Sequence, residues 1–244
     1  MTITWEEIWN KKQADEAILQ NKDFQAVYME LKRITGNDAF GTNKGMSFAQ
    51  LQERFQNFKR ELFFSTDKNK QVSVFEVGCG SGANLFSFEN LGCRVGGIDY
   101  SKSFIAAATK VLRTPVELYY GEAIDLDTEK KYDVVFSNSV FQYFPDEKYA
   151  QQVLERMLAK SNNVICVLEV HDNKLRSDFV NYRRATIEDY DNRYKDLHTL
   201  FLDKEFFLKF ADEHELDIKF VKPNIKGYWN TEFVYDVYMY KRRR

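Results

Sequence analysis

The sequence predicts an α/β fold, with a doubly wound, mostly parallel sheet that ends in an antiparallel hairpin and carries a helical N-terminal extension. From about residue 72 onward, short apolar β-branched runs alternate with helical patterns, which is typical of a parallel sheet covered by helices on both faces. Two strand-like runs near the C-terminus have no helical pattern between them, so they should pair antiparallel. Residues 1–70 show only helical periodicity. We expect one domain, with residues 71–244 as its core.

Three helices are expected in the N-terminal extension. Thr4 and Glu7 have the spacing of a capping box at the start of the first helix. The second is expected over Asp23–Thr35, where apolar residues recur at intervals of three and four. The third opens at Ser47 and repeats the capping-box spacing with Gln50.

The core should consist of seven strand-like runs with helices between most of them. The strands are expected at Val72–Val77, Arg94–Ile98, Val116–Tyr120, Tyr132–Ser137, Val164–Glu169, Leu216–Val221 and Glu232–Tyr240. Two clear helical patterns cover 102–112 and 146–160. Pro145 is expected at the first position of the second of these helices, where a missing backbone N–H costs nothing.

Composition excludes several classes of protein. The 244 residues are 44% hydrophobic and 30% charged, and their net charge is −2. The sequence therefore lacks the basic character of a general nucleic-acid binder. Three cysteines without a CxxC motif favour a reducing, cytoplasmic environment over a disulfide framework or a zinc site. We expect no signal peptide, no membrane span and no metal. The aromatic content of 16%, rich in Tyr, indicates partly wet surfaces such as a pocket wall.

The most informative motif is a glycine loop between the first strand of the core and the helix after it. Gly78, Gly80 and Gly82 allow a sharp turn and a close approach of a ligand to the backbone. The helix that follows presents free N–H groups. Asp99 ends the next strand, where a carboxylate can accept from both hydroxyls of a ribose. A nucleoside-bearing ligand is therefore expected at the carboxyl ends of these strands.

Two carboxylates narrow the choice of nucleoside. The spacing of Gly78, Gly80 and Ala83 formally satisfies a dinucleotide fingerprint, which keeps an NAD-type oxidoreductase as an alternative. Glu76, just before the loop, would repel a pyrophosphate and attract a cation. Glu122, after the third strand, could accept from an adenine amino group. Acidic surroundings favour a sulfonium ligand without phosphates, S-adenosylmethionine.

The segment Glu76–Gly82 closely resembles the glycine motif of class I S-adenosylmethionine-dependent methyltransferases. Asp99 matches their ribose-binding acid, and Gly121–Ala123 resembles their adenine-contacting turn, which more often carries Asp. Tyr132–Tyr143 is similar to their fourth strand and the loop that lines the methionine end. The resemblance covers roughly residues 70–240 and implies a seven-stranded sheet whose last strand is antiparallel. It also implies S-adenosylmethionine as cofactor.

The resemblance and the motifs together give a set of expected cofactor contacts. They are Glu76, Gly78, Cys79, Gly80, Asn84, Asp99, Tyr100, Gly121, Glu122, Ala123, Ser137 and Asn138.

Candidate catalytic residues are His171 and Tyr143. His171 follows the fifth strand, at the sheet edge where an active site should open, and histidine is the commonest general base. A structural histidine held by Asp172 is an equal alternative. Many relatives carry His or Glu where Gln142 or Tyr143 stands, which leaves open whether a base is used or whether the chain is a non-catalytic partner.

The acceptor side is expected to be aromatic. If the extension and the segment after the fifth strand fold over the strand ends, rings including those of Phe40 and Trp229 would form a roof. Arg183 could hold a phosphate or carboxylate, or could belong to an exposed face of ion pairs. The expected substrate-binding residues are Trp5, Trp9, Gln142, Tyr182, Arg183 and Tyr228.

The expected reaction is methyl transfer to nitrogen or oxygen of a small molecule. The segments Trp5–Trp9, Phe40–Thr42 and Gly227–Asn230 look similar to methyltransferases of bacterial polysaccharide and sugar-modifying pathways, which favours a sugar or a polysaccharide precursor. An RNA substrate is disfavoured by the near-neutral charge, and no nucleic-acid or membrane partner is expected.

Overall fold

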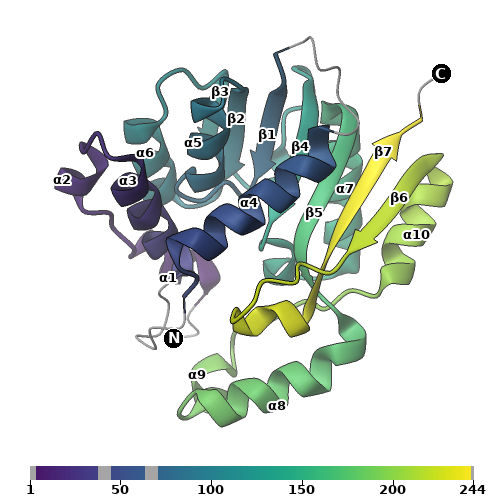
Figure 1. Ribbon diagram of the computed structural model, residues 1–244. Helices are drawn as coiled ribbons and strands as arrows, with labels where there is room; N and C mark the ends of the chain where they lie inside the picture. Colours follow the sequence, from purple (N-terminus) through teal and green to yellow (C-terminus); the bar gives the residue numbers. More distant parts are fainter. Residues whose placement is uncertain (1–3, 38–44, 64–70, 243–244) are drawn as a thin grey trace.

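A seven-stranded sheet forms the centre of the computed structural model, which describes residues 4–37, 45–63 and 71–242 (Figure 1). The strand order is β3-β2-β1-β4-β5-β7-β6, with β1 to β5 parallel and β7 antiparallel to both of its neighbours. The strands are β1 Ser73–Val77, β2 Arg94–Asp99, β3 Glu117–Tyr120, β4 Tyr132–Asn138, β5 Ser161–His171, β6 Leu216–Val221 and β7 Val234–Lys241. The predicted doubly wound sheet with a C-terminal antiparallel hairpin is confirmed.

Helices cover both faces of this sheet (Figure 1). They are α1 Trp5–Asn10, α2 Glu16–Leu19, α3 Phe24–Lys32, α4 Phe48–Phe63, α5 Ala83–Asn90, α6 Lys102–Val111, α7 Glu147–Lys160, α8 Arg176–Thr186, α9 Tyr190–Tyr194 and α10 Lys204–Glu213. None of the described helices combines the length and the apolar character needed to cross a membrane.

Two hydrophobic layers follow from the alternation of side chains along the strands. Val74 and Val134 belong to the layer that includes residues of α3, α4, α5 and α6. Their neighbours Phe75 and Val135 belong to the opposite layer, with residues of α7 and α10. Because successive residues of a strand point to opposite faces, a continuous apolar strand serves both layers, which explains the unbroken hydrophobic runs in the sequence.

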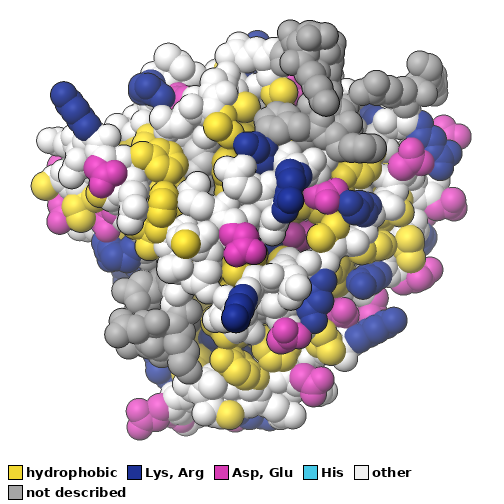
Figure 2. Space-filling model, in the orientation of Figure 1, with side chains coloured by type: hydrophobic (Ala, Val, Ile, Leu, Met, Phe, Trp, Pro, Cys, Tyr) yellow, Lys and Arg dark blue, Asp and Glu magenta, His cyan; other side chains and the backbone are white. Residues whose placement is uncertain are grey.

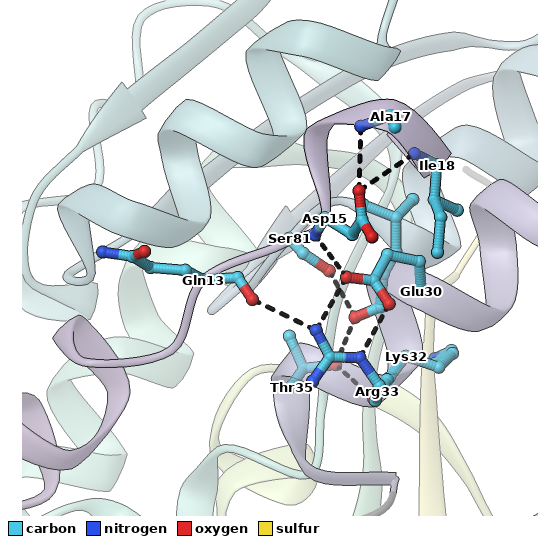
Figure 3. A network of polar contacts seen from close by, with 10 residues as sticks. Gln13, Asp15, Ala17, Ile18, Glu30, Lys32, Arg33, Thr35 and Ser81 are labelled. Atoms are coloured by element: carbon cyan, nitrogen blue, oxygen red, sulfur yellow. Dashed lines mark hydrogen bonds and ion pairs between the residues drawn. The ribbon is translucent and has the colours of Figure 1, made fainter. Parts of the chain in front are cut away.

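The N-terminal extension is held by local capping and by a small polar network. Both capping boxes form, at Thr4 with Glu7 and at Ser47 with Gln50. In the network of Figure 3, Glu30 accepts the backbone N–H of Asp15 at 2.6 Å and pairs with the guanidinium of Arg33. These contacts tie the segment around α2 to α3 within the extension.

The second predicted helix ends earlier than expected. Helix α3 stops at Lys32, and a π-type turn over Arg33–Asn37 replaces its predicted last residues. Gly36 in this turn has φ of +100°, a left-handed conformation that ends a right-handed helix.

Three boundaries in the C-terminal half also differ from the prediction. Strand β5 runs on to His171, so this histidine is the last residue of the strand and does not follow it. Pro145 lies outside α7, because Asp146 is the N-cap and its carboxylate accepts the N–H of Tyr149 at 2.8 Å. A short 3₁₀ helix, Trp229–Glu232, lies between β6 and β7.

The surface carries mixed charge. On the face shown in Figure 2, acidic and basic side chains are interspersed and are not gathered by sign. This distribution accords with the net charge of −2 over the whole sequence.

Candidate cofactor and acceptor site

The glycine loop packs tightly between the N-terminal extension and the segment after β4. Gly78, Gly80 and Gly82 have φ of +71°, +52° and +79°, all in the left-handed region that favours glycine. A Cβ on Gly78 would lie 2.4 Å from Cγ2 of Val140, and one on Gly80 would lie 2.8 Å from Cγ2 of Thr35. These positions therefore require glycine for both conformation and space.

The Asp99 carboxylate is positioned by the backbone at the end of β2. Its Oδ2 accepts the N–H of Gly80 at 2.7 Å, and its Oδ1 accepts the N–H of Ser101 at 2.8 Å. Burial raises the pKa of Asp99 to about 6, against the effect of these two backbone hydrogen bonds. The group is therefore mostly ionised at neutral pH, and its oxygens have lone pairs left for a ligand.

Glu76 in β1 is buried next to the loop and keeps one oxygen without a partner. Its Oε1 accepts from Nδ2 of Asn84 at 2.7 Å, whereas Oε2 has no hydrogen-bond partner. Oδ1 of the same Asn84 accepts from Nζ of Lys32 at 2.9 Å. Burial raises the pKa of Glu76 and lowers the pKa of Lys32. An acidic and a basic side chain are thus joined through one amide, and burial favours the neutral form of each until a ligand of opposite charge binds.

These groups face a cavity of about 760 Å³. It lies at the carboxyl ends of the central strands, where ligands bind in open α/β sheets. Nineteen of the twenty residues predicted for the site line it, namely Trp5, Trp9, Glu76, Gly78, Cys79, Gly80, Asn84, Asp99, Tyr100, Gly121, Glu122, Ala123, Asn138, Gln142, Tyr143, His171, Tyr182, Arg183 and Tyr228. Ser137 is fully buried within β4 and is not part of the lining.

Helix α1 covers one side of the cavity with aromatic rings. The ring of Trp5 packs edge-on against Tyr143 with centroids 4.8 Å apart, and the ring of Trp9 lies 5.9 Å from the same tyrosine. The indole N–H of Trp5 donates to the backbone carbonyl of His198 at 2.9 Å, which ties α1 to the segment after α9. Phe40, also predicted for this roof, lies outside the described residues.

A second aromatic wall comes from α8, α9 and the segment before β7. The rings of Tyr182 and Trp229 stack in parallel, 5.5 Å apart. The guanidinium of Arg183 lies 5.1 Å from the ring centre of Trp229 and 5.2 Å from that of Tyr194. Arg184, the next residue, instead points to solvent and pairs with Asp191, whereas Arg183 lines the cavity.

His171 lies in the cavity wall as a neutral side chain. It is 7% exposed, its Nδ1 has no hydrogen-bond partner, and its ring contacts that of Phe179 at 4.7 Å. Burial and the nearby Arg183 lower the pKa of His171 to about 3. Asp172, the alternative partner predicted for it, accepts the N–H of Lys174. His171 is therefore a hydrogen-bonding group at neutral pH and only a weak base.

Tyr143 and Gln142 follow β4 at the centre of the lining. Burial raises the pKa of Tyr143 to about 12. Nε2 of Gln142 donates to the carbonyl of Ser139 at 2.7 Å, which fixes the amide and leaves its Oε1 buried without a partner. Neither side chain is a proton acceptor of useful strength near neutral pH.

A buried ion network supports the loops on this side and was not anticipated from the sequence. The guanidinium of Arg54 on α4 pairs with Glu169 at 3.0 Å and with Asp236 at 3.1 Å. Glu169 lies at an irregularity of β5 with φ of +57°, and its carboxylate also accepts from the hydroxyl of Ser139. Lys32, Arg54 and Glu169 all line the cavity. No local motif marks them, because their roles depend on contacts between distant segments.

Among the described residues there is no group of three or more His, Cys, Asp or Glu side chains arranged to hold a metal ion. The cavity wall carries carboxylates, amides, cations and aromatic rings. Two carboxylates beside a glycine loop fit a ligand with a ribose and a positive charge.

Comparison with known proteins agrees with this geometry. Residues 75–164 match a family model described as a methyltransferase domain. A malonyl-[acyl-carrier protein] O-methyltransferase of Ilyobacter polytropus is 30% identical over 125 residues, which are 49% of this chain and 45% of that protein. A peramine synthetase of Metarhizium rileyi is 32% identical over 156 residues, 55% of this chain and 5% of that protein. The chain thus spans less than half the length of these relatives.

Solved structures share the fold. The plantazolicin methyltransferase BpumL, in complex with S-adenosylhomocysteine, superposes with a TM-score of 0.63 at 17% identity over 90% of this chain and 94% of that chain. The magnesium protoporphyrin IX methyltransferase of Synechocystis PCC 6803, also with S-adenosylhomocysteine, gives 0.60 at 12% identity over 86% of this chain and 100% of that chain. The chain thus carries a match to a methyltransferase domain over residues 75–164 and shares its fold with methyltransferases solved with S-adenosylhomocysteine.

Proposed function

We propose that this chain transfers a methyl group from S-adenosylmethionine to a nitrogen or oxygen atom of a small molecule. The observation that carries the proposal is the placement of Glu76 and Asp99 on either side of a left-handed glycine loop, in one cavity with an aromatic roof. A sulfonium nucleoside needs a ribose acceptor, room for its chain and negative surroundings, and these residues provide all three.

The cofactor would be held by residues at the ends of three strands, β1, β2 and β3. Asp99 accepts from the ribose hydroxyls, the loop at Gly78 and Gly80 allows close backbone approach, and Glu122 accepts from the adenine amino group. The unpartnered Oε2 of Glu76 is a buried acceptor that suits the ammonium of the methionine part. A pyrophosphate would face the same carboxylates, which disfavours a dinucleotide.

Bound S-adenosylmethionine supplies a methyl group on a sulfonium, so that the leaving group departs as a neutral thioether. The chain contributes orientation and the exclusion of water. The rings of α1 and α8 enclose the acceptor side, and good alignment of two reactants is worth about 7–11 kcal/mol. No acid is needed for the leaving group.

The acceptor should be nucleophilic without help from a protein base. The low pKa of His171 and the raised pKa of Tyr143 make both poor proton acceptors at neutral pH. We propose that His171 and Gln142 instead hydrogen bond to the acceptor and orient it. An amine that enters in its neutral form fits this site well; a hydroxyl would react more slowly.

A sugar or polysaccharide precursor stays our proposed acceptor class from the sequence resemblance. The aromatic walls support it, because rings of Trp and Tyr provide large amphipathic contact surfaces, and an amino sugar would combine such a frame with a neutral nitrogen. The names of the relatives point to other acceptors, malonyl-[acyl-carrier protein] and plantazolicin among them. We also propose a cytoplasmic location, supported by the free thiols of Cys79, Cys93 and Cys166.

Formation of S-adenosylhomocysteine tests the activity. Purified protein with S-adenosylmethionine should release it when amino sugars, sugars or simple amines are added, and Asp99→Asn should lower its release at least about tenfold at limiting cofactor. Cofactor binding without turnover on a small-molecule fraction of cell extract would favour a non-catalytic partner. Binding of NADH instead would favour an oxidoreductase.

A further inference from the structure

The amide bridge between Lys32 and Glu76 makes the N-terminal extension part of the cofactor site. Lys32 is the last residue of α3, outside the segment that matches the methyltransferase family model. In Figure 3 its side chain extends away from the guanidinium of Arg33. It lines the same cavity as Glu76 and Asn84.

The side chains on the two sides of Asn84 carry opposite charges in their ionised forms and do not touch each other directly. The Asn84 amide donates to the Glu76 carboxylate and accepts from the Lys32 ammonium, at 2.7 and 2.9 Å. Among the described residues, Asn84 is the one hydrogen-bond acceptor of the Lys32 ammonium, so two of its three N–H donors remain for a ligand. On the other side of the bridge, Oε2 of Glu76 remains as an acceptor.

Other charged groups face Lys32 as well. Glu76 and Glu169 favour its charged form, whereas burial and Arg54 disfavour it. Arg54 already pairs with Glu169 and Asp236, so its charge is compensated within the protein. Lys32 and Glu76, in contrast, are joined through the neutral side-chain amide of Asn84.

We propose that Lys32 binds the carboxylate of the methionine part of S-adenosylmethionine, while Glu76 binds its ammonium. This inference rests on the proposed cofactor and deepens it. A zwitterionic amino acid presents one positive and one negative group on a single carbon, which matches a carboxylate and an ammonium fixed side by side on one amide. The N-terminal extension would then be required for full cofactor affinity.

Docking of the extension supports this reading. The hydroxyl of Ser81, in the glycine loop, donates to the carbonyl of Leu31 at 2.8 Å, and Thr35 packs over Gly80. The residues on either side of Lys32 are therefore anchored on the loop that holds the cofactor. Such anchoring fixes the ammonium beside Asn84 and reduces the entropy that a flexible lysine would lose on binding.

The test is isothermal titration of the full chain with three ligands. S-adenosylhomocysteine carries both charged groups, its decarboxylated analogue carries the amine alone, and methylthioadenosine carries neither. In the unmodified protein, loss of the carboxylate should weaken binding by at least about tenfold, the value of one charged hydrogen bond. A ratio near one overturns the proposal, whatever the variants do.

Lys32→Met should weaken binding of S-adenosylhomocysteine by at least about tenfold and leave the decarboxylated analogue and methylthioadenosine within about twofold. Lys32→Arg should restore most of the loss. The matched control is Lys110→Met, which removes an exposed ion pair between α6 and Glu16 of the extension without touching the cavity. Equal losses for all three ligands in Lys32→Met would show a merely structural lysine and overturn the proposal. Failure of the unmodified protein to bind any of the three would instead defeat the proposed cofactor itself.

Discussion

Arg54 on α4 and Glu169 in β5 form an ion pair with 3.0 Å between Nε and Oε1, and both side chains are almost wholly buried. Removing one partner of a buried pair leaves an uncompensated charge. Arg54→Met should therefore lower the free energy of unfolding by about 3–5 kcal/mol, measured by urea denaturation. Glu169 and Asp236 would both lose their cation.

An exposed pair of the same kind provides the control. Arg242 and Asp217 also form an ion pair, but both side chains are mostly exposed. Arg242→Gln should change the free energy of unfolding by less than about 1 kcal/mol. If Arg54→Met and Arg242→Gln lower the free energy of unfolding by the same amount, burial does not determine how much the Arg54 network stabilises the protein.

Gly78→Ala should destabilise the protein through both conformation and space. Its φ of +71° costs an L-residue about 1–2 kcal/mol, and contact with Val140 adds about 1–3 kcal/mol of overpacking. Gly92→Ala is a matched control, because Gly92 has φ of +80° with nothing within 4 Å of the new Cβ. The difference in denaturation midpoint between the two variants therefore measures the steric part.

Val140→Ala should rescue part of the loss in Gly78→Ala, since it removes the two methyl groups that the new Cβ would meet. A double-mutant cycle gives the coupling energy. Additive losses would contradict the tight packing of the glycine loop against the segment after β4.

Trp5 should hold helix α1 over the cavity. Trp5→Phe loses the hydrogen bond to the carbonyl of His198 but keeps a ring against Tyr143, whereas Trp5→Ala loses both. Amide hydrogen exchange over residues 5–10 should therefore quicken modestly in the first variant and strongly in the second. If amide exchange over residues 5–10 is unchanged in Trp5→Ala, Trp5 does not hold this helix in place.

Cofactor affinity should depend on the ionisation of Asp99. Its pKa is raised to about 6 in the folded protein, so the carboxylate that accepts from a ribose is lost as the pH falls through 6. The affinity for S-adenosylhomocysteine should therefore decrease as the pH is lowered through 6. The Asp99→Asn variant should bind S-adenosylhomocysteine more weakly than the unmodified protein at pH 7.5, and its affinity should not change with pH around 6. Parallel pH profiles for the two proteins would assign the titration to another group.

The same shift predicts the sign of a stability effect. Because the folded pKa of Asp99 exceeds its ordinary value of 3.8, the folded state favours the protonated form. The contribution of Asp99 to the free energy of unfolding should decrease as the pH rises from about 4 to 6. Urea denaturation of the unmodified protein and of Asp99→Asn between about pH 4 and 6 measures this contribution by difference.

The parts of the site carried by local sequence patterns were predictable. The strand, glycine loop and helix around Gly78 follow one another within a few residues, and Asp99 ends the very next strand. The hairpin of β6 and β7 followed from two adjacent strand patterns without a helical pattern between them.

Features that depend on distant segments were not predictable. Lys32 and Asn84 are 52 residues apart, and Trp5 and the carbonyl of His198 are 193 residues apart. Nothing near Glu169 marks the irregular, left-handed position in β5 that turns its carboxylate toward Arg54. Likewise, the low pKa of His171 arises from burial and from Arg183, and the sequence around His171 indicates neither.

The most direct test of the account is a calorimetric titration of the purified chain with S-adenosylhomocysteine and, separately, with NADH. We predict saturable one-to-one binding of S-adenosylhomocysteine that weakens at least about tenfold in Asp99→Asn, as expected for a lost charged hydrogen bond, and no binding of NADH. Binding of NADH, or no heat with S-adenosylhomocysteine from a folded protein, would contradict it.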